Sequence, residues 1–204
     1  MRRLAISAAF VVALVGAQPV LAEEAPPTQV GADPRVTIEQ IGNGDSAVVT
    51  QPSGGEIDLR QEGDGNSAAV DQSGPGPSTA TLTQSGDAND ARLSQAGGNL
   101  LMTLIQSGYG NHATAIQTGA SVGGDVAELS QAGSFNSASL VQNGDRNSST
   151  QAQIGDWNTQ SIVQTGDGNQ ATYTQVGDYL PDLAIRQSGG MTVSILQTGT
   201  GAGN

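Results

Sequence analysis

Apolar and polar residues alternate over short segments along most of the chain. In residues 79–84, for example, the apolar Ala80 and Leu82 alternate with three threonines. A period of two places one set of side chains on the buried face of a β-strand and the other set on its wet face. The pattern therefore predicts a series of half-buried strands of about seven residues each.

A glutamine closes each of these segments. Nine of the fourteen intervals between successive marker glutamines are eleven residues long, and a glycine lies two positions after fourteen of the fifteen markers. The markers are Gln40, Gln51, Gln61, Gln72, Gln84, Gln95, Gln106, Gln117, Gln131, Gln142, Gln153, Gln164, Gln175, Gln187 and Gln197. The unit Gln-x-Gly-x-x-Asn-x-Ala-x-φ-x-Gln, in which φ is apolar, predicts one strand followed by a turn of about four residues.

One such unit is too small to fold alone. Ordering a unit of eleven residues costs about 11–22 kcal/mol, whereas burial of one leucine and one alanine returns only about 2–4 kcal/mol. Equal strands joined by short turns gain the missing stability when they stack. We therefore predict an all-β fold over residues 36–199, a β-solenoid of about fifteen short strands with two strands in each rung of about 22 residues and amyloid-like cross-β stacking.

The marker amides lie on the same face of each strand as the apolar residues, since Asn66, Ala68, Val70 and Gln72 are each two positions apart. A buried amide without partners is costly, but identical amides one strand spacing apart can hydrogen bond along a stack. We therefore expect inward stacking ladders that fix the strand register. The candidate ladder residues are Gln61, Gln72, Gln95, Gln106, Gln117, Gln131, Gln142, Gln153, Gln164, Gln175, Asn66, Asn89, Asn111, Asn136, Asn147, Asn158 and Asn169.

The first 22 residues have the pattern of a secretory signal peptide. Two arginines precede an apolar run that is too short to span a bilayer, and a small-residue cleavage pattern ends at Ala22. Cleavage there leaves five arginines and no lysine against 19 acids, a net charge of −14. The chain has no cysteine, so packing and hydrogen bonds alone must hold an exported fold. We expect a flexible segment at 23–35 and a short tail at 200–204.

Three segments resemble the curlin repeats of curli subunits, which form functional bacterial amyloid: QEGDGNSAAVDQ (61–72), QSGYGNHATAIQ (106–117) and QTGDGNQATYTQ (164–175). The resemblance covers about 36–199. It implies a secreted structural subunit that reaches the cell surface through the periplasm of a Gram-negative bacterium and assembles into extracellular fibres for biofilm matrix and adhesion. It implies three partners: further copies of the chain, a related nucleator or major subunit, and an outer-membrane secretion channel, which the segment 23–35 either addresses or merely links to the repeats.

The sequence also departs from the repeat. Pro75 and Pro77 lie in one turn, residues 119–126 carry three extra positions, residues 180–181 lack the asparagine, and Gln51 is followed by proline. We expect imperfect rungs at these places. They also leave open whether the chain is the bulk fibre subunit or the nucleator.

The alternative function is a monomeric exported β-solenoid that binds a surface, a glycan or calcium. GDGN at 63–66 and 166–169 is similar to calcium loops of repeat-in-toxin β-helices, but those repeat every nine residues. We predict no enzyme activity, no catalytic residue, no metal or cofactor, and no nucleic-acid partner. His112, the only histidine, is expected to be solvated or stacked. Aromatic residues in the turns either stack between rungs or decorate the surface: Tyr109, Phe135, Trp157 and Tyr179.

Overall fold

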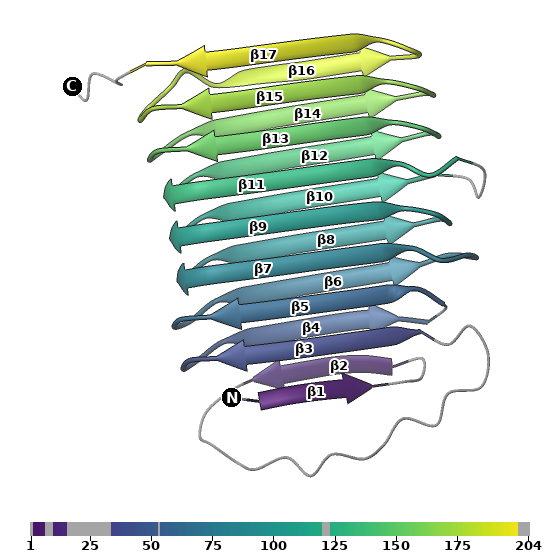
Figure 1. The fold of residues 1–204 in the computed structure, drawn as a ribbon, viewed down its shortest axis with the longest axis vertical. Coiled ribbons are helices and arrows are strands. Elements are labelled where there is room, and N and C mark those ends of the chain that lie inside the picture. Colours follow the sequence, from purple (N-terminus) through teal and green to yellow (C-terminus); the bar gives the residue numbers. More distant parts are fainter. Residues whose placement is uncertain (1, 7–9, 16–33, 53, 120–122, 200–204) are drawn as a thin grey trace.

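The computed structural model describes residues 2–6, 10–15, 34–52, 54–119 and 123–199. All regular secondary structure in these ranges is β-strand, and the strands stack in two layers (Figure 1). The strands are β1 (Arg2–Ile6), β2 (Phe10–Val15), β3 (Arg35–Ile41), β4 (Ser46–Gln51), β5 (Glu56–Glu62), β6 (Ser67–Ser73), β7 (Thr79–Asp87), β8 (Asp90–Ala96), β9 (Leu101–Tyr109), β10 (His112–Thr118), β11 (Val126–Ser134), β12 (Ser137–Asn143), β13 (Ser148–Ile154), β14 (Thr159–Thr165), β15 (Gln170–Val176), β16 (Leu183–Ser188) and β17 (Thr192–Thr198).

The chain alternates between two parallel sheets from β3 onwards. The odd-numbered strands β3 to β17 form one sheet and the even-numbered strands β4 to β16 form the other. Each strand pairs with the strand two further along the chain, so that Leu82 lies beside Leu104 and Gln84 beside Gln106. The predicted β-solenoid with two strands in each rung is confirmed.

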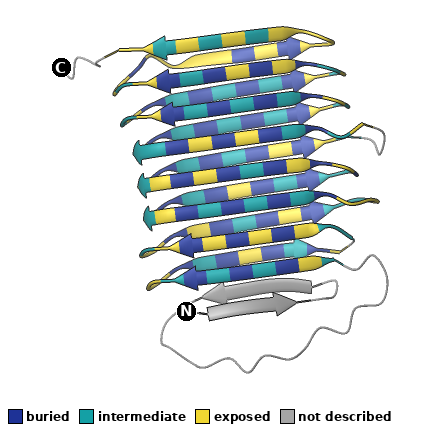
Figure 2. Ribbon diagram, viewed as in Figure 1, coloured by how far each residue is buried: buried dark blue, intermediate teal, exposed yellow. Residues whose placement is uncertain are grey.

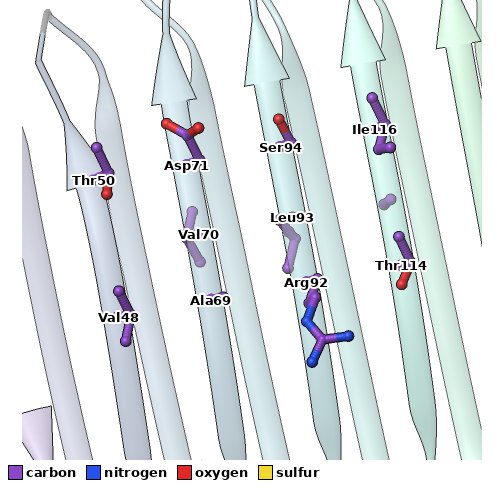
Figure 3. A pocket seen from close by; sticks show the side chains of 11 residues that line it. Val48, Thr50, Ala69, Val70, Asp71, Arg92, Leu93, Ser94, Thr114 and Ile116 are labelled. Atoms are coloured by element: carbon purple, nitrogen blue, oxygen red, sulfur yellow. The ribbon is translucent and has the colours of Figure 1, made fainter. Parts of the chain in front are cut away.

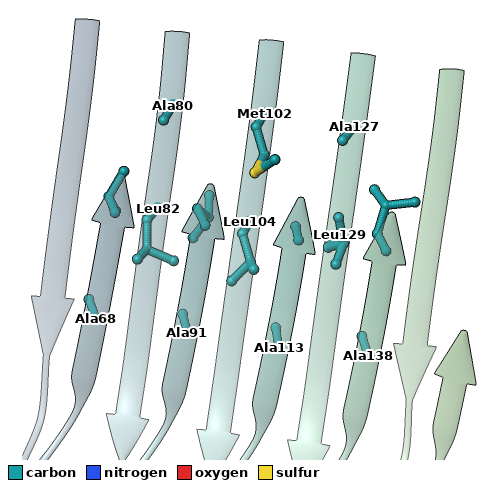
Figure 4. Close-up of a cluster of buried hydrophobic side chains, with 14 of the residues drawn as sticks. Ala68, Ala80, Leu82, Ala91, Met102, Leu104, Ala113, Ala127, Leu129 and Ala138 are labelled. Carbon is teal, nitrogen blue, oxygen red and sulfur yellow. The ribbon is translucent and has the colours of Figure 1, made fainter. Parts of the chain in front are cut away.

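The core is a narrow apolar layer between the two sheets. Burial alternates along each strand and produces the stripes of Figure 2. Large side chains of the odd sheet, such as Leu82 and Leu104, share one buried cluster with small side chains of the even sheet, such as Ala91 and Ala113 (Figure 4). Small and large residues in facing positions allow the sheets to pack closely without voids.

One region of this core is polar. Ser149, Gln151 and Gln160 occupy inward positions that are apolar in most rungs, and each is 1% exposed or less. The Oγ atom of Ser149 and the Oε1 atoms of both glutamines have no hydrogen-bond partner among the described residues. Unpaired buried polar atoms cost stability, so these side chains make the layer less stable at β13 and β14 than apolar residues would.

Glycines form columns in the turns because the backbone of the next rung approaches too closely for a side chain. A Cβ atom added at Gly133 lies 2.1 Å from the carbonyl oxygen of Gly155, and φ at Gly133 is +123°. The same close approach recurs at Gly86 and Gly108. At these three positions the glycine two residues after the marker glutamine is therefore needed for stacking as well as for the turn.

The strands keep their register beside three of the four departures from the repeat. Gln72 still pairs with Gln95 across the turn that contains both prolines, and Gln164 pairs with Gln187 despite the change at 180–181. Gln117 pairs with Gln142 across the insertion. The expectation of imperfect rungs is therefore wrong for strand pairing at these three places, because the extra residues are accommodated in the turns.

The N-terminal strands differ from the repeats. β1 pairs with β3 and β2 pairs with β4, and both pairings are antiparallel. Both strands lie within the predicted signal peptide, which stays a prediction. Most of the expected flexible segment 23–35 and the whole tail 200–204 lie outside the described residues. In the part of the chain that the structure describes, no helix is long and apolar enough to cross a membrane.

Candidate assembly site: amide columns and open strand edges

The marker glutamines of the odd sheet form a continuous hydrogen-bonded column inside the solenoid. Each side-chain Nε2 donates to Oε1 of the glutamine in the next rung towards the C-terminus, across 2.7–3.1 Å. The column contains Gln40, Gln61, Gln84, Gln106, Gln131, Gln153, Gln175 and Gln197. All but Gln40 and the terminal Gln197 are at most 1% exposed.

The even sheet carries a second column with the same direction of donation. Its amide contacts are 2.5–3.0 Å long. The column contains Gln51, Gln72, Gln95, Gln117, Gln142, Gln164 and Gln187. All ten glutamines that the sequence marks as ladder candidates therefore lie in one of these two columns.

These amides also connect the two sheets. Nε2 of Gln142 on β12 donates to Oε1 of Gln164 and also to the backbone carbonyl of Val126 on β11, 3.0 Å away. Nε2 of Gln153 on β13 reaches the carbonyl of Ser137 on β12 in the same way. The amides of Gln142 and Gln153 thus use both of their N–H groups, which removes the penalty for their burial.

The asparagines form two columns on opposite edges of the solenoid. Asn66, Asn89, Asn111, Asn136 and Asn158 lie in turns that follow odd strands. Asn147 and Asn169 lie in turns that follow even strands, and Asn169 Nδ2 donates to Asn147 Oδ1 across 2.9 Å.

The asparagine columns donate in the direction opposite to the glutamine columns. The backbone N–H and Nδ2 of Asn89 both donate to Oδ1 of Asn66 in the preceding rung, each across 3.1 Å. Nδ2 of Asn89 also donates to the carbonyl of Gly108 in the next rung. Each asparagine therefore fixes the turn below it and the turn above it.

Two buried aspartates stand at the start of these columns, and the sequence reasoning missed both. Asp45 Oδ1 accepts from the backbone N–H of Asn66, and Asp125 Oδ1 accepts from that of Asn147, 2.7 Å away. Their Oδ2 atoms have no partner among the described residues. Burial raises the pKa of the Asp125 carboxyl from 3.8 to about 6, and it also raises the pKa of Asp45.

The two ends of the stack present complementary groups. At the N-terminal end, the buried Oε1 atoms of Gln40 and Gln51 have no hydrogen-bond partner among the described residues. At the C-terminal end, Ile195 and Gln197 on β17 face inward but are only partly buried, because no strand of the described residues covers them. The free acceptors lie at one end and the last donors of the columns lie at the other.

Four aromatic side chains stack along the edge formed by the turns after odd strands. The ring centroids of Tyr109 and Phe135 are 5.3 Å apart, those of Phe135 and Trp157 are 4.3 Å apart, and those of Trp157 and Tyr179 are 6.2 Å apart. All four side chains are 41–56% exposed. The last three have φ between 52° and 58°, where the first two turns of this edge have glycine. These rings contact one another and are not isolated surface decoration.

The remaining candidates for chemistry are few. His112 is about half exposed, and its Nδ1 lies 3.0 Å from Oδ2 of Asp90 in the preceding rung. Over the residues with described side chains, no cluster of three or more His, Asp or Glu has the geometry to hold a metal ion. A shallow depression crosses the outer face of the even sheet over β4, β6, β8 and β10, beside Ala69. Its ionisable lining residues are Asp71 and Arg92 (Figure 3). It reflects unequal lengths of outward side chains.

A comparison with known protein families finds a match for one segment of the repeats. Residues 78–108, which include β7, β8 and all but the last residue of β9, match the family model described as the curlin associated repeat. This segment is a curlin-like repeat. The two-strand rung of the matched segment recurs through β3 to β17. No curated protein and no solved structure matches the chain.

Proposed function

We propose that this protein is a secreted structural subunit that self-assembles end to end into curli-like extracellular amyloid fibres, which serve biofilm matrix and surface adhesion. The observation that carries the proposal is the pair of unfinished amide columns. Gln40 and Gln51 offer buried acceptors at one end of the solenoid, and the two columns end at Gln187 and Gln197 at the other end. Nε2 of Gln187 donates to the backbone carbonyls of Gln170 and Met191, so it has to exchange the Met191 bond for a bond to an incoming glutamine. A second copy supplies the missing partners.

The open backbone edges favour the same conclusion. A strand at the end of a sheet presents unpaired N–H and C=O groups, and soluble solenoids protect such ends with capping elements. No strand covers the outer edges of β16 and β17 in the described part of the chain. Addition of another copy would pair these edges and bury the inward side chain of Ile195, which is only partly buried in the single chain.

In this proposal, export determines when the N-terminal end of the stack can pair with another copy. β1 and β2 pair with β3 and β4, and both belong to the predicted signal peptide. Cleavage after Ala22 would uncover the edges of β3 and β4. The chain then crosses the periplasm and leaves through an outer-membrane secretion channel. At the cell surface it assembles with a related nucleator or major subunit.

The test uses the purified chain 23–204 at neutral pH. We expect a lag, followed by fibres that bind thioflavin T and Congo red and give cross-β reflections at about 4.8 Å and about 10 Å. A monomer that stays soluble at high concentration for days contradicts the proposal. It would favour the monomeric solenoid that binds a surface, a glycan or calcium.

A matched pair of variants separates end-to-end growth from other association. Ile195→Glu places a charge on the inward face of the terminal strand, where a second copy would have to desolvate it. Leu196→Glu places the same charge on the outer face, where Leu196 is 70% exposed. We expect Ile195→Glu to abolish fibre growth and Leu196→Glu to permit it, and equal effects of the two substitutions contradict growth at this edge.

A further inference from the structure

The two sheets contain different numbers of repeat strands. Over residues 34–199, the odd sheet has eight strands, β3 to β17, and the even sheet has seven, β4 to β16. The stack therefore begins and ends on the same sheet. The last rung is half complete, with β17 one strand level beyond β16.

The next strand level of a continuing solenoid belongs to the even sheet. Strands alternate between the sheets without exception from β3 to β17. A strand that follows β17 in this order has to pair with β16, and the one after it has to pair with β17. The first repeat strand of an incoming copy is β3, which belongs to the odd sheet of its own copy.

We propose that successive copies in the fibre are related by a half-turn about the fibre axis, so that β3 of the second copy pairs with β16 and β4 of the second copy pairs with β17. This inference rests on the proposed end-to-end assembly. Odd and even strands run in opposite directions on opposite sides of the solenoid (Figure 1). A half-turn reverses the direction of β3 and moves it to the other side of the solenoid. There it runs parallel to β16, as neighbouring repeat strands do within each sheet.

The side chains fit at this junction. Aligning the marker glutamines places Gln187 below Gln40 of the second copy, and it places Ile185 below Ile38 of the second copy. On the other sheet, Gln197 comes below Gln51 of the second copy. The two unpartnered Oε1 atoms at the N-terminal end thus meet the two terminal Nε2 groups, and Gln187 exchanges its bond to the Met191 carbonyl for a bond to Gln40 of the second copy.

The arrangement without rotation leaves a gap. If β3 of the second copy pairs with β17, the second copy is raised by one strand level, and its β4 stands two strand spacings, or about 9.6 Å, above β16. The backbone groups on the facing edges of β16 and β4 then remain unpaired inside the fibre. Buried backbone groups are almost always paired, which disfavours this arrangement.

The half-turn can be observed directly with a single label, because the chain has no cysteine. Ser134 is the last residue of β11, at the edge that carries the aromatic stack, and Ser134→Cys introduces one attachment point for a small gold cluster. Electron microscopy of labelled 23–204 fibres is expected to show labels that alternate between the two edges, with about 72 Å between labels on the same edge. Labels along only one edge overturn the half-turn.

Truncation variants of the labelled chain test whether strand number determines the symmetry. Removal of residues 192–204 leaves fourteen repeat strands, and removal of 181–204 leaves thirteen. We expect labels on one edge at intervals of about 34 Å for the first variant, and alternating labels for the second. Fibres in which both variants show the full-length pattern refute strand number as the origin of the symmetry but leave assembly intact. Failure of the full-length chain to form fibres refutes the proposed function, and the half-turn with it.

Discussion

Gln117 donates its Nε2 hydrogen to Oε1 of Gln142 across 2.8 Å, although 25 residues separate the two in the chain. Six of the thirteen neighbouring pairs in the columns are 22 residues apart, and the longer interval reflects the insertion in the turn after β10. The amide column therefore holds the register even where the turn length changes. Slippage by one residue would turn every inward side chain of the strand outward.

Loss of interior amides is expected to slow assembly. Gln142→Ala, Gln153→Ala and Gln164→Ala each leave a neighbouring amide and a backbone carbonyl without a partner, at a cost of about 1–3 kcal/mol for each buried group. The lag time of thioflavin T fluorescence and the resistance of the fibres to guanidinium chloride measure the effect. Thr172→Ala and Ser161→Ala on the outer face are the controls and should cost less than about 0.5 kcal/mol. Equal effects of inner and outer substitutions argue against the role of the columns.

Gly133→Ala is expected to prevent close stacking of its turn. The added Cβ atom would lie 2.1 Å from the backbone carbonyl oxygen of Gly155, which cannot move without breaking the rung. We expect a loss of roughly 3 kcal/mol or more. Gly65→Ala is the matched control, because φ is +69° there but no heavy atom lies within 4 Å of the added Cβ. It should cost about 1–2 kcal/mol, and similar losses in both variants would exclude the steric explanation.

The buried Asp125 carboxyl makes stability depend on pH. Its pKa is raised by burial from 3.8 to about 6 in the folded chain, so the folded state binds the proton more tightly than the unfolded state. The penalty is therefore complete above about pH 6 and is relieved as the pH falls through 6 towards 3.8. Asp125→Asn removes the charge and is expected to stabilise the chain at pH 7 by about 1–3 kcal/mol.

The same comparison at low pH provides the control. Wild type and Asp125→Asn share the neighbouring carboxylates Asp145 and Asp167, so their general pH dependence cancels in the difference. Denaturant midpoints should converge as the pH falls from 7 to 4. A constant difference over this range contradicts an ionised, buried Asp125.

Trp157 occupies a left-handed backbone conformation, with φ at 58°. Trp157→Gly loses the ring contacts with Phe135 and Tyr179 but also removes the backbone strain. Trp157→Ala loses the same contacts and keeps the strain, so we expect it to be less stable than Trp157→Gly by about 1 kcal/mol. Thermal unfolding followed by circular dichroism measures the difference. Greater stability of the alanine variant would refute strain at this turn.

The inward glutamine columns were predictable because a period of two assigns every residue to a face. Gln142 and Leu140 share a parity, and repetition over fifteen units leaves one stacking arrangement that satisfies all of them. The number of strands, from which the half-turn follows, is also present in the sequence.

Other parts of the site could be recognised only in the structure. Asp125 lies eight positions after Gln117 because of the insertion, so the usual five-residue spacing does not reveal that it takes the place of an asparagine. The aromatic stack did leave a signal, since Phe135, Trp157 and Tyr179 are each 22 residues apart. That spacing equals one rung, but ring contact also depends on side-chain orientation, which the spacing does not determine.

The opposite directions of donation in the glutamine and asparagine columns have an electrical consequence for a long fibre. In an α-helix the peptide dipoles add, and charge accumulates at the two ends. Here the Gln84 amide points its donor towards the C-terminal end, whereas the Asn89 amide in the following turn donates to Asn66 towards the N-terminal end. The two sets of side-chain dipoles partly cancel. Each added subunit therefore adds a smaller side-chain dipole along the axis than its glutamine columns would add alone.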